Sequence, residues 1–174
     1  LAFWRTYALP VMVVRPFNTY GPREPSEGYR AEVIPKFTLR TLAGQPPVIF
    51  GDGSQTRDFT WVEDTARGII LAAECDALIG DAVNIACGQE VSIARICDLV
   101  LEKVGCPQEK PQFLQAGRPG DVSRHYADIS KAKALLNYSP TITIEQGIEK
   151  YTTWLREQNI DIQQWLAQEQ IQNW

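Results

Sequence analysis

The side chains that most often do chemistry in proteins are sparse in this sequence, which holds one histidine, His125, and four cysteines, Cys75, Cys87, Cys97 and Cys106. Zinc sites use pairs of cysteine or histidine ligands a few residues apart, and no two of these cysteines have that spacing. The histidine stands in a polar run without a serine or cysteine motif, which argues against a histidine-based catalytic group. We therefore expect no metal site, and we interpret the cysteines as free thiols in a reducing compartment, the cytoplasm.

A glycine pair could in principle cradle a phosphate. Residues 51–53 read Gly-Asp-Gly, as at the start of a G-x-G-x-x-G loop, but Thr56 stands where the last glycine would be. The segment also follows no long strand and opens no immediate helix, which that loop requires. We interpret residues 51–53 as a simple hairpin turn.

The chain that must position any site has 174 residues, 44% hydrophobic and 22% charged, with a net charge of −4. This is the composition of one globular domain large enough to bury its own core. The charges are interspersed, so nothing resembles the basic stripe of a nucleic-acid-binding protein. The longest apolar runs, such as residues 69–73, fall far short of the ~20 residues that a membrane span needs.

A continuous apolar run at residues 11–14 predicts a strand buried on both faces, as in a parallel sheet. Residues 18–23 then form a turn-rich segment at the carboxyl end of that strand, where open α/β sheets bind their ligands. The other elements alternate between strands and helices and predict an α/β fold. Strands are expected at 48–50, 57–62, 82–86 and 112–115, and helices at 1–9, 33–43, 63–75, 93–104, 130–136 and 143–157.

Several helix boundaries rest on specific residues. Ser92 and Ser130 are expected to cap the helices that follow them, and Gly105 to end the first of these. Thr143 and Gln146 form a capping-box pattern for the helix that ends near residue 157. The glutamine-rich stretch 158–174 is predicted to be an amphipathic helical tail, separate from a main portion over 1–157.

Four ordered segments resemble the nucleotide-sugar epimerases and dehydratases, which are extended short-chain dehydrogenase/reductase enzymes. Residues 15–23 read Arg-Pro-Phe-Asn-Thr-Tyr-Gly-Pro-Arg, and residues 33–35 read Val-Ile-Pro at the start of a helix. Residues 50–59 read Phe-Gly-Asp-Gly-Ser-Gln-Thr-Arg-Asp-Phe, and residues 118–121 read Arg-Pro-Gly-Asp. The resemblance implies the C-terminal part of such an enzyme. This part would combine one or two strands of the Rossmann sheet with a small mixed α/β subdomain that binds substrate.

The resemblance also implies roles for single residues. Arg57 and Arg118 match the contacts to the substrate pyrophosphate, a role that suits the forked guanidinium group. Asn18 matches a donor to the same phosphates, and Asp121 matches a contact to the nucleotide ribose. Three residues border the base pocket, where the backbone of the last two reads the base: Val33, Val48 and Phe50. Two residues lie where the family's backbone approaches the nicotinamide of NAD: Pro16 and Phe17.

Each of these residues also has a purely structural interpretation. Arg57 could form a surface ion pair with its neighbour Asp58, and Asn18 could be only a turn residue. Asp121 could form an Asx turn. Asp64, at the start of a helix, is most simply a cap or a partner of the helix dipole.

The family's other functional parts are not found in this sequence. No tyrosine is followed four residues later by a lysine, so the catalytic Tyr-x-x-x-Lys pair is missing, as is the NAD-binding glycine loop. Since the first residue is Leu1 and the only methionine is Met12, we infer a piece of a longer protein, inactive by itself. Its partner would be a nucleoside-diphosphate sugar, with NAD in the full-length enzyme and no nucleic acid or membrane. Alternatives are a non-catalytic nucleotide-binding module and an oligomer-forming fragment, because strand 11–14 would expose an edge that drives homo-oligomer formation.

Overall fold

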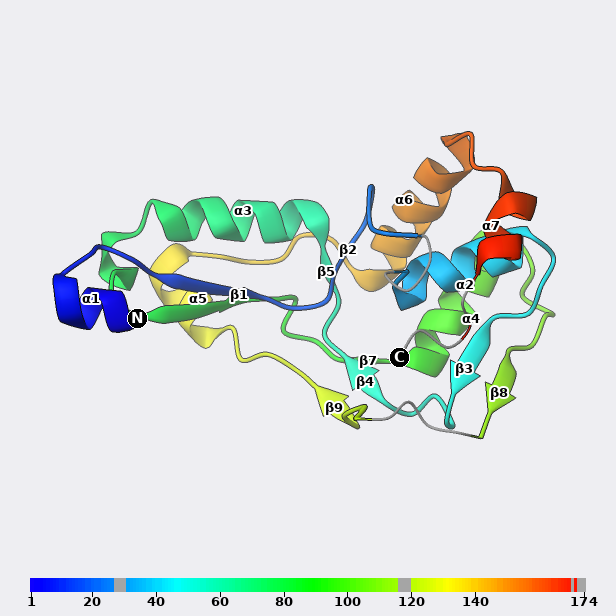
Figure 1. Cartoon of the computed structure of the whole chain (residues 1–174), viewed down its shortest axis with the longest axis horizontal. Helices are drawn as coiled ribbons and strands as arrows, with labels where there is room; N and C mark the ends of the chain where they lie inside the picture. Colours follow the sequence, from blue (N-terminus) through cyan, green and yellow to red (C-terminus); the bar gives the residue numbers. More distant parts are fainter. Residues whose placement is uncertain (27–30, 116–119, 170, 172–174) are drawn as a thin grey trace. The chain divides into compact units, whose positions relative to one another are not determined.

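The computed structural model describes residues 1–26, 31–115, 120–169 and 171, and its chain divides into two compact units (Figure 1). Unit 1 comprises Leu1–Tyr20, Asp58–Glu90 and His125–Ile144, and unit 2 comprises Gly21–Arg57, Val91–Arg124 and Glu145–Trp174. Each unit is therefore assembled from three separate stretches of the chain. None of the described helices is long and apolar enough to cross a lipid bilayer.

Unit 1 is built on a parallel pair of strands, β1 (Val13–Pro16) and β6 (Ala82–Ile85), with Val13 opposite Ala82 and Pro16 opposite Ile85. This pair confirms the expectation of one or two strands of a parallel sheet. The strand that follows β1 and the strand that precedes α3 form a shorter parallel pair, with Thr19 opposite Thr60. The remaining elements of the unit are α1 (Ala2–Tyr7), β2 (Thr19–Tyr20), β5 (Thr60–Trp61), α3 (Val62–Ala73), the 3-10 turn η2 (Asp76–Leu78) and α5 (Ser130–Leu136).

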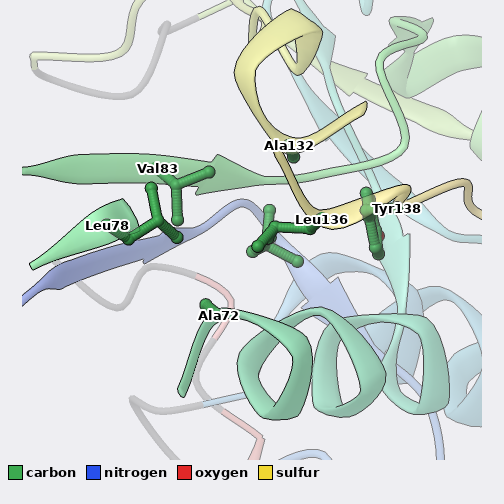
Figure 2. Close-up of a cluster of buried hydrophobic side chains, with 7 residues drawn as sticks. Ala72, Leu78, Val83, Ala132, Leu136 and Tyr138 are labelled. Atoms are coloured by element: carbon green, nitrogen blue, oxygen red, sulfur yellow. The ribbon is translucent and has the colours of Figure 1, made fainter. Parts of the chain in front are cut away.

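An apolar cluster joins α3, β6, η2 and α5 (Figure 2). Ala72 of α3, Val83 of β6 and Leu136 of α5 belong to it, together with Leu78 and Tyr138. The prediction that β1 is buried on both faces is wrong. Its valines are only partly buried and Arg15 and Pro16 are exposed, because in the described part of the chain β6 is its one neighbouring strand.

Unit 2 combines helices with short sheets. Its elements are α2 (Val33–Leu42), β3 (Val48–Phe50), β4 (Thr56–Arg57), β7 (Val91–Ser92), α4 (Ile93–Val104), β8 (Gln112–Leu114), α6 (Ile144–Glu157) and α7 (Ile162–Gln168). Strand β9 (Arg124–His125) lies at the boundary between the units and pairs with β4. β3 pairs in parallel with β8, and β4 pairs antiparallel with β7. Buried residues of α2, α4 and α6, such as Phe37, Leu99 and Ile148, form its interior.

Most of the predicted boundaries are confirmed. Ser92 caps α4, its Oγ accepting from the Arg95 N–H at 3.1 Å, and Gly105 ends that helix in the left-handed conformation. The cap of α5 was predicted wrongly. Ser130 is the first helical residue, and the Asp128 carboxylate accepts from its N–H at 2.8 Å.

Two predictions near residue 57 are also wrong. The turn at 51–53 exists, but it is no hairpin turn, because β3 and β4 on either side of it belong to different sheets. The single strand expected over 57–62 is two short strands, β4 and β5, interrupted at Asp58 and Phe59.

Candidate functional site

The segment after β1 carries three of the residues selected from the sequence. Pro16 ends the strand and is exposed, and Phe17 continues the ladder by donating its N–H to the Ile85 carbonyl at 3.1 Å. The ring of Phe17 lies 4.8 Å from the ring of His125 and packs against the small buried cluster that includes Ala127. The carboxyl end of β1 is therefore held in place by these contacts and is partly exposed to solvent.

Asn18 has the geometry of a turn residue. Its φ angle is 28°, in the left-handed region that asparagine tolerates better than most residues. Its Nδ2 donates to the Asp58 carbonyl at 2.9 Å, and its own carbonyl accepts from the Thr60 N–H at 3.2 Å. The side chain thus has a structural contact, which leaves its Oδ1 and its second N–H proton for any further role.

The most densely bonded side chain of this region is Asp58, which the sequence singled out only as a possible ion partner of Arg57. It is fully buried, and its carboxylate accepts from the backbone N–H groups of Cys87 and Gly88 at 3.0 Å each and of Ala127 at 3.4 Å. Burial raises the pKa of this carboxyl, and the three N–H groups act in the opposite direction. The Asp58 carboxylate therefore ties the chain at residue 58 to the segments that follow β6 and β9.

The close approach of the backbone N–H at position 88 to the Asp58 carboxylate explains why this residue is glycine. Gly88 has a φ angle of 73°, and a Cβ there would lie 2.7 Å from Cδ1 of Ile129. Only glycine therefore lets the backbone N–H come this close to the carboxylate without strain.

In unit 2, Arg57 and Asp121 are ion-paired with each other although they are far apart in the sequence. Nη1 of Arg57 also donates to the carbonyls of Thr56 at 2.6 Å and Val122 at 2.8 Å. The two side chains are 15% and 27% exposed, so solvent reaches the pair. The described residues engage three of the five N–H donors of the guanidinium. The alternative ion pair of Arg57 with Asp58 is not found, since Asp58 binds backbone N–H groups of unit 1.

Residues 33, 48 and 50 also lie in unit 2. Val48 and Phe50 are partly buried on one face of β3, while Ile49 between them is buried on the other. The Phe50 carbonyl accepts from Nε2 of Gln55 at 3.0 Å, and Val33 begins α2 and is partly buried. Arg118, the second predicted pyrophosphate contact, lies outside the described residues.

Asp64 was interpreted as a cap or dipole partner of the helix it begins. It does lie in the first turn of α3, but its carboxylate binds elsewhere. It accepts from the N–H groups of Thr141 at 2.9 Å and Ile142 at 3.1 Å, and from Arg67 at 2.5 Å. Its role in the fold is to fasten the segment before α6 to α3.

Sequence reasoning missed Glu24, which belongs to the loop after the Tyr-Gly-Pro-Arg motif. Its Oε2 accepts from the Gly21 N–H at 3.3 Å. Burial raises the pKa of its carboxyl from 4.5 to about 8, and the negative charge of Glu32 acts in the same direction. No feature of the sequence could indicate this, because the loop reads as polar and exposed. Burial therefore keeps this carboxyl protonated to a higher pH than an exposed glutamate.

Glu24 predicts a pH-dependent stability. The unfolded chain loses the Glu24 proton near its ordinary pKa of 4.5, whereas the folded chain keeps it until about pH 8. Stability should therefore fall as the pH rises from about 4.5 to 8 and then become level. Thermal unfolding of the Glu24→Gln variant, which stays neutral, should lack this part of the fall. Glu109→Gln, on the surface, serves as the control and should follow the wild type; an unchanged pH profile in Glu24→Gln would contradict the assignment.

The described residues contain no group of three or more histidine, cysteine, aspartate or glutamate side chains placed to hold a metal ion, and all four cysteines are free thiols. The site candidates thus form two sets, one at the end of β1 in unit 1 and one around the Arg57–Asp121 pair in unit 2. The set at the end of β1 offers the side-chain amide of Asn18 beside Pro16 and Phe17. The set in unit 2 offers N–H donors of Arg57, the Asp121 carboxylate and partly buried apolar side chains. Such groups can bind a polar ligand with negative charge.

Comparison with known proteins identifies relatives of this chain. Residues 1–151 match the family model described as GDP-mannose 4,6 dehydratase. The chain is 38% identical over 157 residues to a UDP-glucuronate 4-epimerase of Thermodesulfobacterium geofontis, covering 90% of this chain and 46% of that protein. The chain spans about half the length of the curated relatives it matches.

Solved structures show the same likeness. One is the UDP-glucose 4-epimerase of Thermotoga maritima with UDP-glucose, at 33% identity and a TM-score of 0.83 over 90% of this chain and 49% of that one. Another is the UDP-glucuronic acid 4-epimerase of Bacillus cereus in complex with UDP-glucuronic acid and NAD. It is 32% identical to this chain, with a TM-score of 0.82, and the match covers 90% of this chain and 48% of the epimerase.

Proposed function

Because the chain belongs to the GDP-mannose 4,6 dehydratase family and corresponds to the C-terminal half of its relatives, we propose that it binds a nucleoside-diphosphate sugar. In this proposal it is the substrate-binding half of an NAD-dependent epimerase or dehydratase. The observation that carries the proposal is the fixed guanidinium of Arg57, held by Asp121 and two backbone carbonyls. Relatives with bound UDP-sugars support the choice of ligand.

Arg57 suits a diphosphate for a physical reason. Three contacts hold its guanidinium in one orientation, so binding a ligand there costs little side-chain entropy. Two of its N–H donors are engaged by no described residue, and they can form a fork on two phosphate oxygens. Arg118 would supply the second positive charge, as the family motif implies. The pair with Asp121 also prevents Arg57 from turning to another carboxylate before the ligand arrives.

The other residues would hold the rest of the ligand. Asp121 has a second carboxylate oxygen that can accept from a ribose hydroxyl while the first stays paired with Arg57. Asn18 would donate its second Nδ2 proton to a phosphate oxygen. The partly buried face formed by Val48 and Phe50, together with Val33, would border the base.

NAD would touch only a small part of this chain. The exposed Pro16 and the partly buried Phe17 at the end of β1 fit the edge of a flat ring, while the sequence has no glycine loop for the cofactor's phosphates. NAD, when bound in the full-length enzyme, supplies hydride transfer. This chain's own residues would orient the sugar nucleotide and form one wall of the cofactor site. Since it has no Tyr-x-x-x-Lys pair, we expect no turnover from this chain alone.

Removal of Arg57 tests the proposal directly. We expect Arg57→Ala to weaken binding tenfold to a hundredfold, because one charge-assisted contact to phosphate contributes ~1.5–3 kcal/mol. Arg57→Lys should recover only part of the loss, since a point charge cannot form the fork. The measurement is calorimetric titration of the chain with UDP-glucose, UDP-glucuronic acid, dTDP-glucose and GDP-mannose.

The matched control is Arg156→Ala. Arg156 is exposed on α6 and donates to the Val104 carbonyl at 2.7 Å, so its removal takes away one positive charge outside the proposed site. It should leave the affinity unchanged. Equal affinities of Arg57→Ala and Arg156→Ala would disprove the pyrophosphate role, and no binding of any of the four ligands at millimolar concentration would argue against the function itself.

A further inference from the structure

Helix α7 lies beyond residues 1–151, the part of the chain that matches the family model, so that match assigns the helix no role. The helix packs against α2 within unit 2 (Figure 1). It has seven residues, and isolated helices shorter than ~12–15 residues are marginal in water. Its helical form therefore depends on its contacts with the rest of unit 2, so docking and helix formation are one event.

Two polar anchors hold α7 in place. Trp165 is the one buried residue of the helix, and its indole Nε1–H donates to the Ser26 carbonyl. Glu169, at the end of the helix, accepts from Nη1 of Arg40 on α2 at 2.5 Å. The side chains of Arg40 and Glu169 are only 9% and 7% exposed, so breaking this ion pair leaves a charge in a poorly solvated position.

Both anchors reach segments that border the proposed base pocket. Ser26 belongs to the loop that leads into α2, and Val33 is the first residue of that helix. Arg40 also donates its Nε–H to the Pro46 carbonyl at 2.7 Å, and Pro46 stands just before β3, which begins at Val48. α7 is therefore bonded, directly or through Arg40, to the chain ahead of each of the two elements that carry the pocket.

We propose that α7 is a latch for the proposed nucleotide site: it alternates between this docked helix and a released, unfolded form, and its docking orders the loop before α2 and the segment before β3. The ligand then binds the docked form more tightly. By linkage, the ligand favours docking by the same factor, and any agent that takes up α7 lowers the affinity of the site. The effect on affinity rests on the proposed function, whereas the ordering of the two segments does not.

A competing explanation is that α7 only adds to the stability of unit 2 as a whole. A general stabiliser changes the opening of the whole unit, so that every slowly exchanging amide speeds up together when it is lost. Release of a latch opens only the segments that it bonds. Because α7 contributes one buried side chain while α2, α4 and α6 form the interior, the structure favours the local opening.

Three variants separate the anchors of α7 from the rest of the helix. Trp165→Ala and Glu169→Gln each remove one anchor, and they are called the anchor variants. Gln168→Ala, at an exposed position of the same helix, is the matched control. All three keep the interior formed by α2, α4 and α6, so the remainder of unit 2 should stay folded.

Amide hydrogen exchange of the chain without ligand tests the ordering. Two reporter amides follow the bordering segments: the Glu32 N–H donates to the Pro25 carbonyl at 3.4 Å, and the Gln112 N–H donates to the Pro47 carbonyl at 2.8 Å. In the anchor variants both should exchange at least ~5-fold faster, because the open state of these segments becomes more populated. The Cys106 N–H, at the end of α4, should keep its wild-type rate.

Calorimetric titration with UDP-glucose then tests the effect on the site. Both anchor variants should raise the dissociation constant ~5-fold or more, which is the lower end of typical coupling between two sites, and Gln168→Ala should bind like the wild type. In the wild type, saturating UDP-glucose should also slow the exchange of the Trp165 N–H, which donates to the Asp161 carbonyl at 2.9 Å within the docked helix.

The outcomes separate the latch from the proposed function. Unchanged exchange at the two reporter amides, an equal rise at Cys106, or wild-type affinity in both anchor variants would each overturn the latch. If the wild type itself binds no sugar nucleotide, the proposed function fails, and the exchange rates still decide whether α7 orders the two segments.

Discussion

Replacement of Asp58 by alanine is expected to lower the free energy of unfolding by about 4 kcal/mol, because each of three backbone donors would lose its acceptor at a cost of ~1–3 kcal/mol. The donors are the N–H groups of Cys87, Gly88 and Ala127, and the aspartate is fully buried, so water cannot easily replace the carboxylate. A domain of this size is stable by only ~5–15 kcal/mol. The variant should therefore unfold at a much lower urea concentration.

Asp58→Asn refines this expectation. The amide keeps the size of the side chain and one acceptor oxygen, but its NH₂ group faces an N–H group, so the loss should be smaller than with alanine and still clear. Asp98→Ala, at an exposed position of α4, is the control and should change the urea midpoint little. Wild-type midpoints for both Asp58 variants would show that the carboxylate does not hold the three segments together.

Gly68→Val is expected to cost about 3 kcal/mol, at the upper end of the ~1–3 kcal/mol typical of overpacked cores. A Cβ at this helical position would lie 2.5 Å from Cγ2 of Ile85 and 3.0 Å from Cε2 of Tyr138, and both neighbours are buried. Helix propensity alone predicts the opposite sign, because glycine is the weaker helix former by several tenths of a kcal/mol. The sign of the change in unfolding free energy therefore shows whether packing or helix propensity dominates at this position.

Two further variants decide the matter. Gly68→Ala should also destabilise, although alanine gains ~1 kcal/mol in helix propensity over glycine. When it is combined with Ile85→Ala, which removes the clashing Cγ2 and Cδ1 atoms, the loss should be less than the sum of the two single changes. A stabilised Gly68→Ala variant, or strict additivity in the double variant, would mean that α3 can shift away from β6 at little cost.

Local signals in the sequence predicted the local structure well. A serine cap and a terminal glycine fixed both ends of α4, and the short apolar run between two prolines and a glycine gave the bounds of β3. β1 was expected from the continuous apolar run at residues 11–14, and a strand was also expected over 82–86, where β6 lies. These signals act within a few residues of where they stand, which is why they can be interpreted without the rest of the chain.

Long-range partners could not be predicted in the same way. The motif around residue 57 indicated a contact site, but not that Arg57 is held by Asp121, nor that Asp58 turns away to bind three N–H groups. The break between β4 and β5 has the same origin, since the chain bends where Asp58 reaches its distant donors.

The interleaving of the two units sets the order of events on the ribosome. Unit 1 needs residues 1–20, 58–90 and 125–144, so β1 is made before its partner β6, and β6 is made before α5. At ~5–20 residues per second, several seconds pass between the synthesis of β1 and that of β6. For the same reason, a truncated product that ends before α5 contains a completed version of neither unit and should be degraded.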